Sequence, residues 1–242
     1  MTATENPVIR YQQILNDVFQ RIVETQLPAL TIAGQWVADC VASGNLIYTL
    51  GSGHSLLIAT ELYYRAGGLA NFDVIHDKTF GRAERLPGYA KVLLESYPIS
   101  SNDLLILVSN SGRNELTVEM ALEARMRGIR TIAITSLAHS LSASPRTASG
   151  RRLSEVADLV IDNCGVPGDA SLELFSPLGP VVVAPTSTAA GIFIANSIVS
   201  IAVQQLIDRN FDPPVFASAN TDTGDKRNVA LLQFLRDRVR GL

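Results

Sequence analysis

The chain has 242 residues, which suits one α/β domain over residues 1–242 better than two separate domains. Apolar residues make up 47 % of the sequence and charged residues 18 %, so the chain can bury a core, and disorder is excluded. Acidic and basic residues are mixed and the net charge is −3, which leaves no basic face for nucleic acid. The two cysteines are far apart and form no metal-binding motif, so we expect reduced thiols in the cytoplasm, no metal and no cofactor.

The predicted elements begin with two helices in an N-terminal segment, residues 1–44. Apolar residues between Tyr11 and Val23 recur at helical spacing. Pro28 either ends this helix or begins the second one, and Gly44 is a suitable stop. The first residues lack the basic start and apolar core of a signal peptide.

Strands and helices then alternate through an α/β core, residues 45–210. Apolar runs predict strands at 46–50, 72–75, 103–109, 130–135 and 158–161, and helices at about 55–66 and 115–127. We expect a loop with one short helix at 136–157 and irregular chain at 162–186, where Pro and Gly are frequent. Continuous apolar strands separated by helices indicate a parallel sheet covered on both faces, which is a three-layer α/β sandwich.

A long apolar helix is predicted from about Thr188 to Ile207. The stretch 188–203 is shorter than the ~20 residues that a membrane span needs, and it carries Asn196, Ser197 and Ser200. We therefore expect a buried core or interface helix and no membrane partner. The tail, residues 211–242, holds a polar turn and a final amphipathic helix.

Small polar side chains follow the first and third strands. In an open parallel sheet, ligands bind at the carboxyl ends of the strands. The first loop, "GSGHS" (51–55), opens a helix whose free N–H groups would favour phosphate, although a plain turn with a serine N-cap has the same residues. The second loop, "SNSGRN" (109–114), has the same character. Together they offer these candidate phosphate ligands: Ser52, Gly53, Ser55, Ser109, Asn110, Ser111 and Asn114.

A third group of hydroxyls, "PTST" (185–188), precedes the long helix and adds Thr186, Ser187 and Thr188 as candidates, although ordinary N-capping explains them slightly better. None of the three loops is a nucleotide motif. No Gly-Lys-Ser/Thr follows the second loop, and Leu56 occupies the third glycine position of a dinucleotide fingerprint in the first.

The paired loops resemble those of the sugar isomerase (SIS) domain family. The family pattern is G-x-G/T-x-S after the first strand and S-x-S-G-x-S/T after a later one. The chain is most similar to stand-alone bacterial SIS proteins described as phosphosugar-binding, which share "GSGHS…YRAGGL", "NSGRN", "PTST" and a tail like "SANTDTGD". The resemblance covers most of the chain.

The resemblance implies a Rossmann-like, five-stranded parallel sheet between helices, a homo-oligomer (dimer or tetramer) and a sugar phosphate as ligand. Carried over by position, Ser55, Ser109 and Ser111 would meet the phosphate. Asn114 replaces the more usual Ser or Thr, and its amide can still donate to the phosphate, although the sugar's orientation need not follow the family's.

Isomerisation of a sugar phosphate needs a base near neutral pH and usually a second group that opens the ring. The predicted catalytic set is His54, Glu61 and His76; Asp77 and Glu84 are further candidates, and we do not expect His139 to act. Each member of the set has a structural alternative. Glu61 and Arg65 have the spacing of a helical ion pair, His76 follows a strand end, and His54 can face solvent.

Three functions therefore remain open. The first is a phosphosugar isomerase or lyase. The second is a non-catalytic phosphosugar-binding or sensor protein. The third, which the missing fingerprint disfavours, is a nucleotide-binding oxidoreductase.

Overall fold

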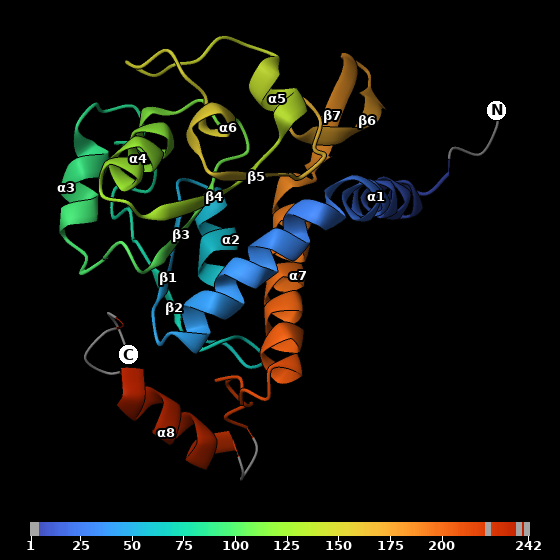
Figure 1. Ribbon diagram of the computed structural model, residues 1–242. Coiled ribbons are helices and arrows are strands. Elements are labelled where there is room, and N and C mark those ends of the chain that lie inside the picture. Colours follow the sequence, from blue (N-terminus) through green and yellow to red (C-terminus); the bar gives the residue numbers. More distant parts are fainter. Residues whose placement is uncertain (1–4, 221–223, 236–238, 240–242) are drawn as a thin grey trace.

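The computed structural model describes residues 5–220, 224–235 and 239 (Figure 1). Its centre is a five-stranded parallel sheet with the strand order β2-β1-β3-β4-β5. The strands are β1 (Ile47–Gly51), β2 (Phe72–Val74), β3 (Leu104–Val108), β4 (Arg130–Thr135) and β5 (Leu159–Asp162). This sheet confirms the predicted α/β class and the parallel pairing.

Helices cover both faces of the sheet, as the apolar strands require. Apolar residues of α1 (Pro7–Ala42), α2 (Ser55–Glu61) and α7 (Ser187–Asp208) form one core with the sheet. Those of α3 (Tyr89–Glu95), α4 (Glu115–Met126), α6 (Leu153–Val156) and α8 (Gly224–Leu235) form the core on the other face. The three-layer arrangement is therefore confirmed, and it leaves the carboxyl ends of the strands for loops.

The prediction of two N-terminal helices is wrong, because α1 continues through Pro28. Proline removes one backbone hydrogen bond and disfavours a helix interior. Here the buried face runs on both sides of the proline and packs along α7, as Figure 1 shows. Contact is close: a Cβ atom on Gly34 would lie 2.4 Å from Ile201 Cγ2. Packing of the buried face between Val18 and Val41 outweighs the local cost of Pro28.

The prediction of irregular chain at 162–186 is also wrong. β6 (Ala170–Ser176) and β7 (Gly179–Pro185) form an antiparallel hairpin, which lies apart from the main sheet near the start of α1 (Figure 1). Long-range hydrogen bonds hold it there: Arg10 Nη2 donates to the carbonyl of Glu173, and the Tyr11 hydroxyl donates to that of Pro185. The predicted elements also omit α3, and 136–157 holds α6 as well as α5 (Leu137–Leu141).

α7 is long and apolar enough to span a membrane by length and composition, but 44 % of its most apolar window is buried in the fold. Its buried residues belong to the core shared with α1 and the sheet. The C-terminal tail returns to the sheet edge, where Leu69 and Val215 form an isolated antiparallel bridge. The predicted polar turn of the tail includes residues 221–223, which lie outside the described residues.

Candidate functional site

The loops after β1 and β3 start side by side. The two strands are paired in parallel, and their last partners are Gly51 and Val108. A cavity of about 190 Å³ lies where the loops meet. Its polar lining comprises Ser52, Ser55, Ser109, Asn110, Ser111, Asn114, Thr117, Glu84 and His139. We call this cavity the cradle. It brings together six of the seven candidate ligands from the first two loops.

The first loop depends on its glycines. A Cβ atom on Gly51 would lie 2.2 Å from the Ser55 carbonyl oxygen, and Gly53, the seventh candidate, has φ +57° at the exposed tip. The backbone N–H groups of Ser55 and Leu56 donate to the carbonyls of Ser52 and Gly53. These N–H groups are thus engaged within the loop, contrary to the expectation that they would be free for an anion. The loop therefore offers hydroxyl groups to the cradle.

The second loop is held by short contacts around Gly112. Its N–H donates to Ser109 Oγ at 3.1 Å, and a Cβ atom there would lie 2.8 Å from Thr135 Oγ1. Asn110 Oδ1 accepts from Asn163 Nδ2 at 2.9 Å, which leaves the Asn110 amide nitrogen as a donor. Asn114 is the N-cap residue of α4 and makes no side-chain cap hydrogen bond. Asn114 lines the cradle, and within the described residues its side chain is not used to cap α4.

The turn over residues 77–84 adds a third wall. Ser52 Oγ lies 3.4 Å from Glu84 Oε2 and 3.5 Å from Asp77 Oδ2. Asp77 is buried, and its carboxylate accepts hydrogen bonds from Thr79, Gly81 and the Tyr89 hydroxyl. Burial alone would raise the pKa of Asp77, but these hydrogen bonds outweigh it and hold the pKa below its ordinary value.

His139 lies in the cradle, although no pattern in the sequence points to that position. It belongs to α5, and the N–H of Gly168 donates to its Nδ1 at 2.8 Å. A neutral imidazole that accepts at Nδ1 carries its proton on Nε2. His139 therefore has one N–H donor left for a ligand. The contact to Gly168 joins segments distant in sequence, so no local pattern reveals it.

The third set of hydroxyl-bearing residues, Thr186, Ser187 and Thr188, does not line the cradle. Asp169 accepts from the backbone N–H groups of Thr186 and Ser187 at 3.1 and 2.8 Å and from Ser187 Oγ at 2.6 Å. These donors are therefore engaged at the start of α7, but the acceptor is the distant Asp169, and the N-cap residue Thr186 makes no side-chain cap hydrogen bond within the described residues, unlike the N-capping alternative. Thr186 Oγ1 is buried without a hydrogen-bond partner, and Thr188 is half-buried on the same turn.

The structure places the predicted catalytic set outside the cradle. His54 is exposed at the tip of the first loop. Glu61, at the far end of α2, pairs with Arg65 and accepts from Asn196 Nδ2 at 3.4 Å. His76 is exposed and lines a separate cavity of about 850 Å³ with three tyrosines, Tyr63, Tyr89 and Tyr97.

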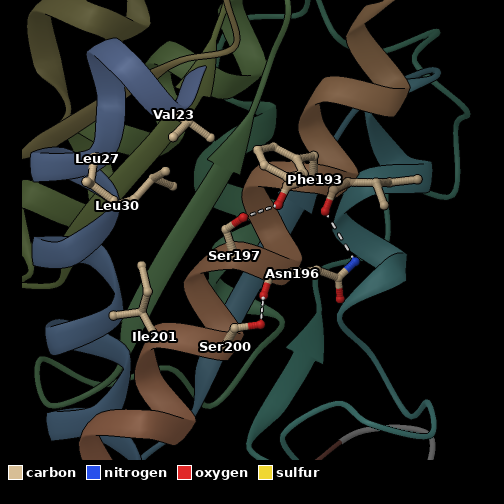
Figure 2. A pocket seen from close by; sticks show the side chains of 9 residues that line it. Val23, Leu27, Leu30, Phe193, Asn196, Ser197, Ser200 and Ile201 are labelled. Atoms are coloured by element: carbon tan, nitrogen blue, oxygen red, sulfur yellow. Dashed lines mark hydrogen bonds between the residues drawn. The ribbon is translucent and has the colours of Figure 1, made fainter. Parts of the chain in front are cut away.

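A third cavity, of about 580 Å³, is an apolar groove between α1 and α7 (Figure 2). Its aliphatic and aromatic lining includes Val23, Leu27, Leu30, Ile192, Phe193 and Ile201. The two serines in its wall bond back to their own helix: Ser197 Oγ donates to the Phe193 carbonyl at 2.7 Å, and Ser200 Oγ to that of Asn196 at 2.8 Å. The groove therefore presents an apolar surface and not a sugar site.

Comparison with known proteins places the chain among proteins of similar architecture. Residues 10–136 match the family model described as the SIS domain. A UPF0309 protein from Shouchella clausii is 37 % identical over 93 % of this chain and 95 % of its own length.

Two solved structures share the fold. A phosphoheptose isomerase from Francisella tularensis has a TM-score of 0.59 and 16 % identity over 84 % of this chain and 100 % of that one. The NanR protein of Vibrio vulnificus, complexed with ManNAc-6P, has a TM-score of 0.59 and 15 % identity over 96 % of this chain and 70 % of that one.

Proposed function

Because the chain belongs to the SIS domain family, we propose that it binds a sugar phosphate in the cradle and moves a proton between neighbouring carbons of the sugar. The observation that carries the proposal is the convergence of the loops after β1 and β3. They bring Ser55, Ser109, Ser111 and Asn114, with their neutral donor groups, to one cavity. A phosphate oxygen accepts several such hydrogen bonds, each of which contributes about 1.5–3 kcal/mol when one partner is charged.

The size of the cradle suits the phosphate end of a ligand. Its volume of about 190 Å³ is below the ~300–1,000 Å³ of sites that enclose a whole small molecule. The sugar would therefore extend beyond it, past Glu84 and His139. The structural neighbour NanR is complexed with ManNAc-6P, which supports the class of ligand.

An isomerase is favoured over a non-catalytic binding protein by the groups beside the predicted phosphate position. Glu84 is a proton acceptor and His139 a proton donor, and both line the cradle. A site that only recognised phosphate would gain nothing from a carboxylate, since two negative charges repel each other. The predicted roles of His54, Glu61 and His76 remain hypotheses, and Glu61→Gln tests the strongest of them.

The partner and location predictions extend the proposal. We expect a homo-oligomer in the cytoplasm, in which the apolar groove between α1 and α7 meets a second copy. The third set of hydroxyls, on the first turn of α7, would then serve the fold through Asp169 rather than the phosphate.

A ligand screen tests the function. Thermal-shift measurements compare the melting temperature of the protein with pentose, hexose and heptose phosphates and with NAD(P), the competing class of ligand. The ligand that stabilises the protein most is then titrated by calorimetry. We expect sugar phosphates to raise the melting temperature and Ser111→Ala to weaken their binding. Ser101→Ala is the control, because Ser101 is exposed in the turn before β3, at the other end of the strand from the cradle. Stabilisation by dinucleotides alone would refute the proposal.

A further inference from the structure

We propose that Glu84 is the group that transfers the proton in this site, and that Asp77 is the residue that positions it. The inference rests on the proposed function and names the residues that would carry it out. It is an alternative to the predicted set of His54, Glu61 and His76, none of which lines the cradle.

Glu84 is fixed at both walls of the cradle. Its side chain lies 3.4 Å from Ser52 Oγ of the first loop. Its carbonyl accepts from the N–H of Leu116 at 3.0 Å, in the first turn of α4, directly after the second loop. The same residue therefore contacts the elements that follow β1 and β3. Its carboxylate is held beside the donors that would take the phosphate.

Asp77 closes the turn that carries Glu84. Its exposed fraction is 3 %, and it accepts from Thr79 N at 2.9 Å, Thr79 Oγ1 at 2.6 Å and Gly81 N at 2.8 Å. The Tyr89 hydroxyl donates to it at 3.0 Å, which ties the turn to α3. Asp77 does not line the cradle, and it contacts the cradle's lining in two ways, through the turn and through Ser52 Oγ, which lies 3.5 Å from its Oδ2.

The turn also lies directly against the first loop. Gly81 has φ +82°, and a Cβ atom on it would lie 3.2 Å from Ser52 Oγ and 3.3 Å from Gly53 N. A Cβ atom at this position is therefore in tight contact with the first loop, which must shift by a few tenths of an ångström to accept it. The geometry at Glu84 is therefore set by Asp77 within the turn and by close contact with the first loop.

The charge environment separates Glu84 from Glu61. Glu61 is paired with the guanidinium of Arg65. Within residues 5–220, 224–235 and 239, no ion pair within 4.0 Å involves Glu84. Its carboxylate is thus available to accept a proton from a ligand.

The chemical step balances with these groups alone. Glu84 takes the proton from the carbon next to the sugar carbonyl, and the C–H electron pair forms the C=C bond of an enediolate. The carbonyl oxygen gains the negative charge, which the N–H on Nε2 of His139 stabilises by a hydrogen bond. Glu84 then returns the proton to the neighbouring carbon while a hydroxyl proton moves to the first oxygen, and aldose becomes ketose without an external oxidant.

Deuterium exchange tests the assignment whichever product the reaction forms. The protein is incubated in D2O with each sugar phosphate that raises its melting temperature, and mass spectrometry measures deuterium bound to carbon. We expect Glu84→Gln to lower the exchange rate by about 10²–10⁴-fold, the usual contribution of a general acid–base group, with the ligand Kd changed less than about threefold. Glu95→Gln, an exposed glutamate on α3, is the charge control and should exchange at the wild-type rate.

Asp77→Asn should lower kcat by a larger factor than it raises KM, because Ser55, Ser109, Ser111 and Asn114 keep their positions on the other loops although the contact to Ser52 Oγ is weakened. A parallel rise in KM, together with a loss of melting temperature as large as that of Thr79→Ala, would show that Asp77 has only a structural role.

If the Glu84→Gln variant exchanges deuterium at the wild-type rate, the inference is overturned. If Glu61→Gln alone loses exchange, the role belongs to Glu61. Binding without exchange in the wild-type protein would overturn it and leave phosphosugar binding intact. If no sugar phosphate binds, the proposed function itself fails.

Discussion

Two glycines at the ends of one segment allow a matched test of the third wall of the cradle. Gly81 and Gly88 both have φ +82°, a conformation that costs an alanine about 1–2 kcal/mol. A Cβ atom at Gly81 meets Ser52 Oγ at 3.2 Å, whereas one at Gly88 meets nothing within 4 Å. The substitutions Gly81→Ala and Gly88→Ala therefore share a backbone cost and differ in the contact with the first loop.

The expected results follow from that difference. Urea denaturation should show a loss of about 1–2 kcal/mol in the free energy of unfolding for both variants. Only Gly81→Ala should weaken binding of the best sugar phosphate in calorimetry, by about tenfold, which corresponds to about 1.4 kcal/mol and to roughly one hydrogen bond. Equal Kd values for the two variants would refute the reasoning that the turn over 77–84 forms part of the binding wall.

Further predictions concern the phosphate donors, pH, helix packing and assembly. Ser111→Ala should reduce sugar-phosphate affinity by about 1.5–3 kcal/mol in calorimetry, because one hydrogen bond to a charged group is lost; an unchanged Kd would remove Ser111 from the site. Asp77 has a lowered folded pKa, so its stabilisation is present above the ordinary value of about 3.9 and is lost as the pH falls through the folded pKa. In the Asp77→Asn variant, the free energy of unfolding should therefore fall less steeply as the pH is lowered into the acid range. The same pH dependence in the variant and the wild type would contradict this. Gly34→Ala should cost about 1–3 kcal/mol in urea denaturation, since its Cβ would overlap Ile201; wild-type stability would mean that α1 can move away from α7. Leu27→Glu, at a side chain 53 % exposed in the groove, should convert an oligomer to monomers in sedimentation experiments, and a monomeric wild type would contradict the assembly proposal.

The parts of the fold that are predicted correctly have local signals. The apolar run of β3 is buried over its whole length, and small polar residues follow it directly. The first loop has the same pattern after β1. Because the carboxyl ends of parallel strands share one edge, these two loops are expected at a common site, and they meet at the pairing of Gly51 with Val108.

The errors arise where distant contacts decide the structure. Pro28 is a local helix breaker, but packing of α1 against α7 keeps the helix continuous. The hairpin of β6 and β7 contains Pro180 and Pro185, which are unfavourable in most strands but tolerated where the partner strand is antiparallel and the edge is free. Glu84 and His139 reach the cradle through bonds to Leu116 and Gly168, which no sequence window includes.

The register of β1 and β3 also has a consequence for the folding of the chain. β2 and α3 lie between them in sequence, so a long segment must be ordered before the two strands can pair. A growing chain that ends before β3 therefore has no binding site, however well its first helices are formed. In native-state hydrogen exchange, a bound phosphosugar should slow exchange most at amides that open only with the whole sheet, such as those of Ile106 and Leu107.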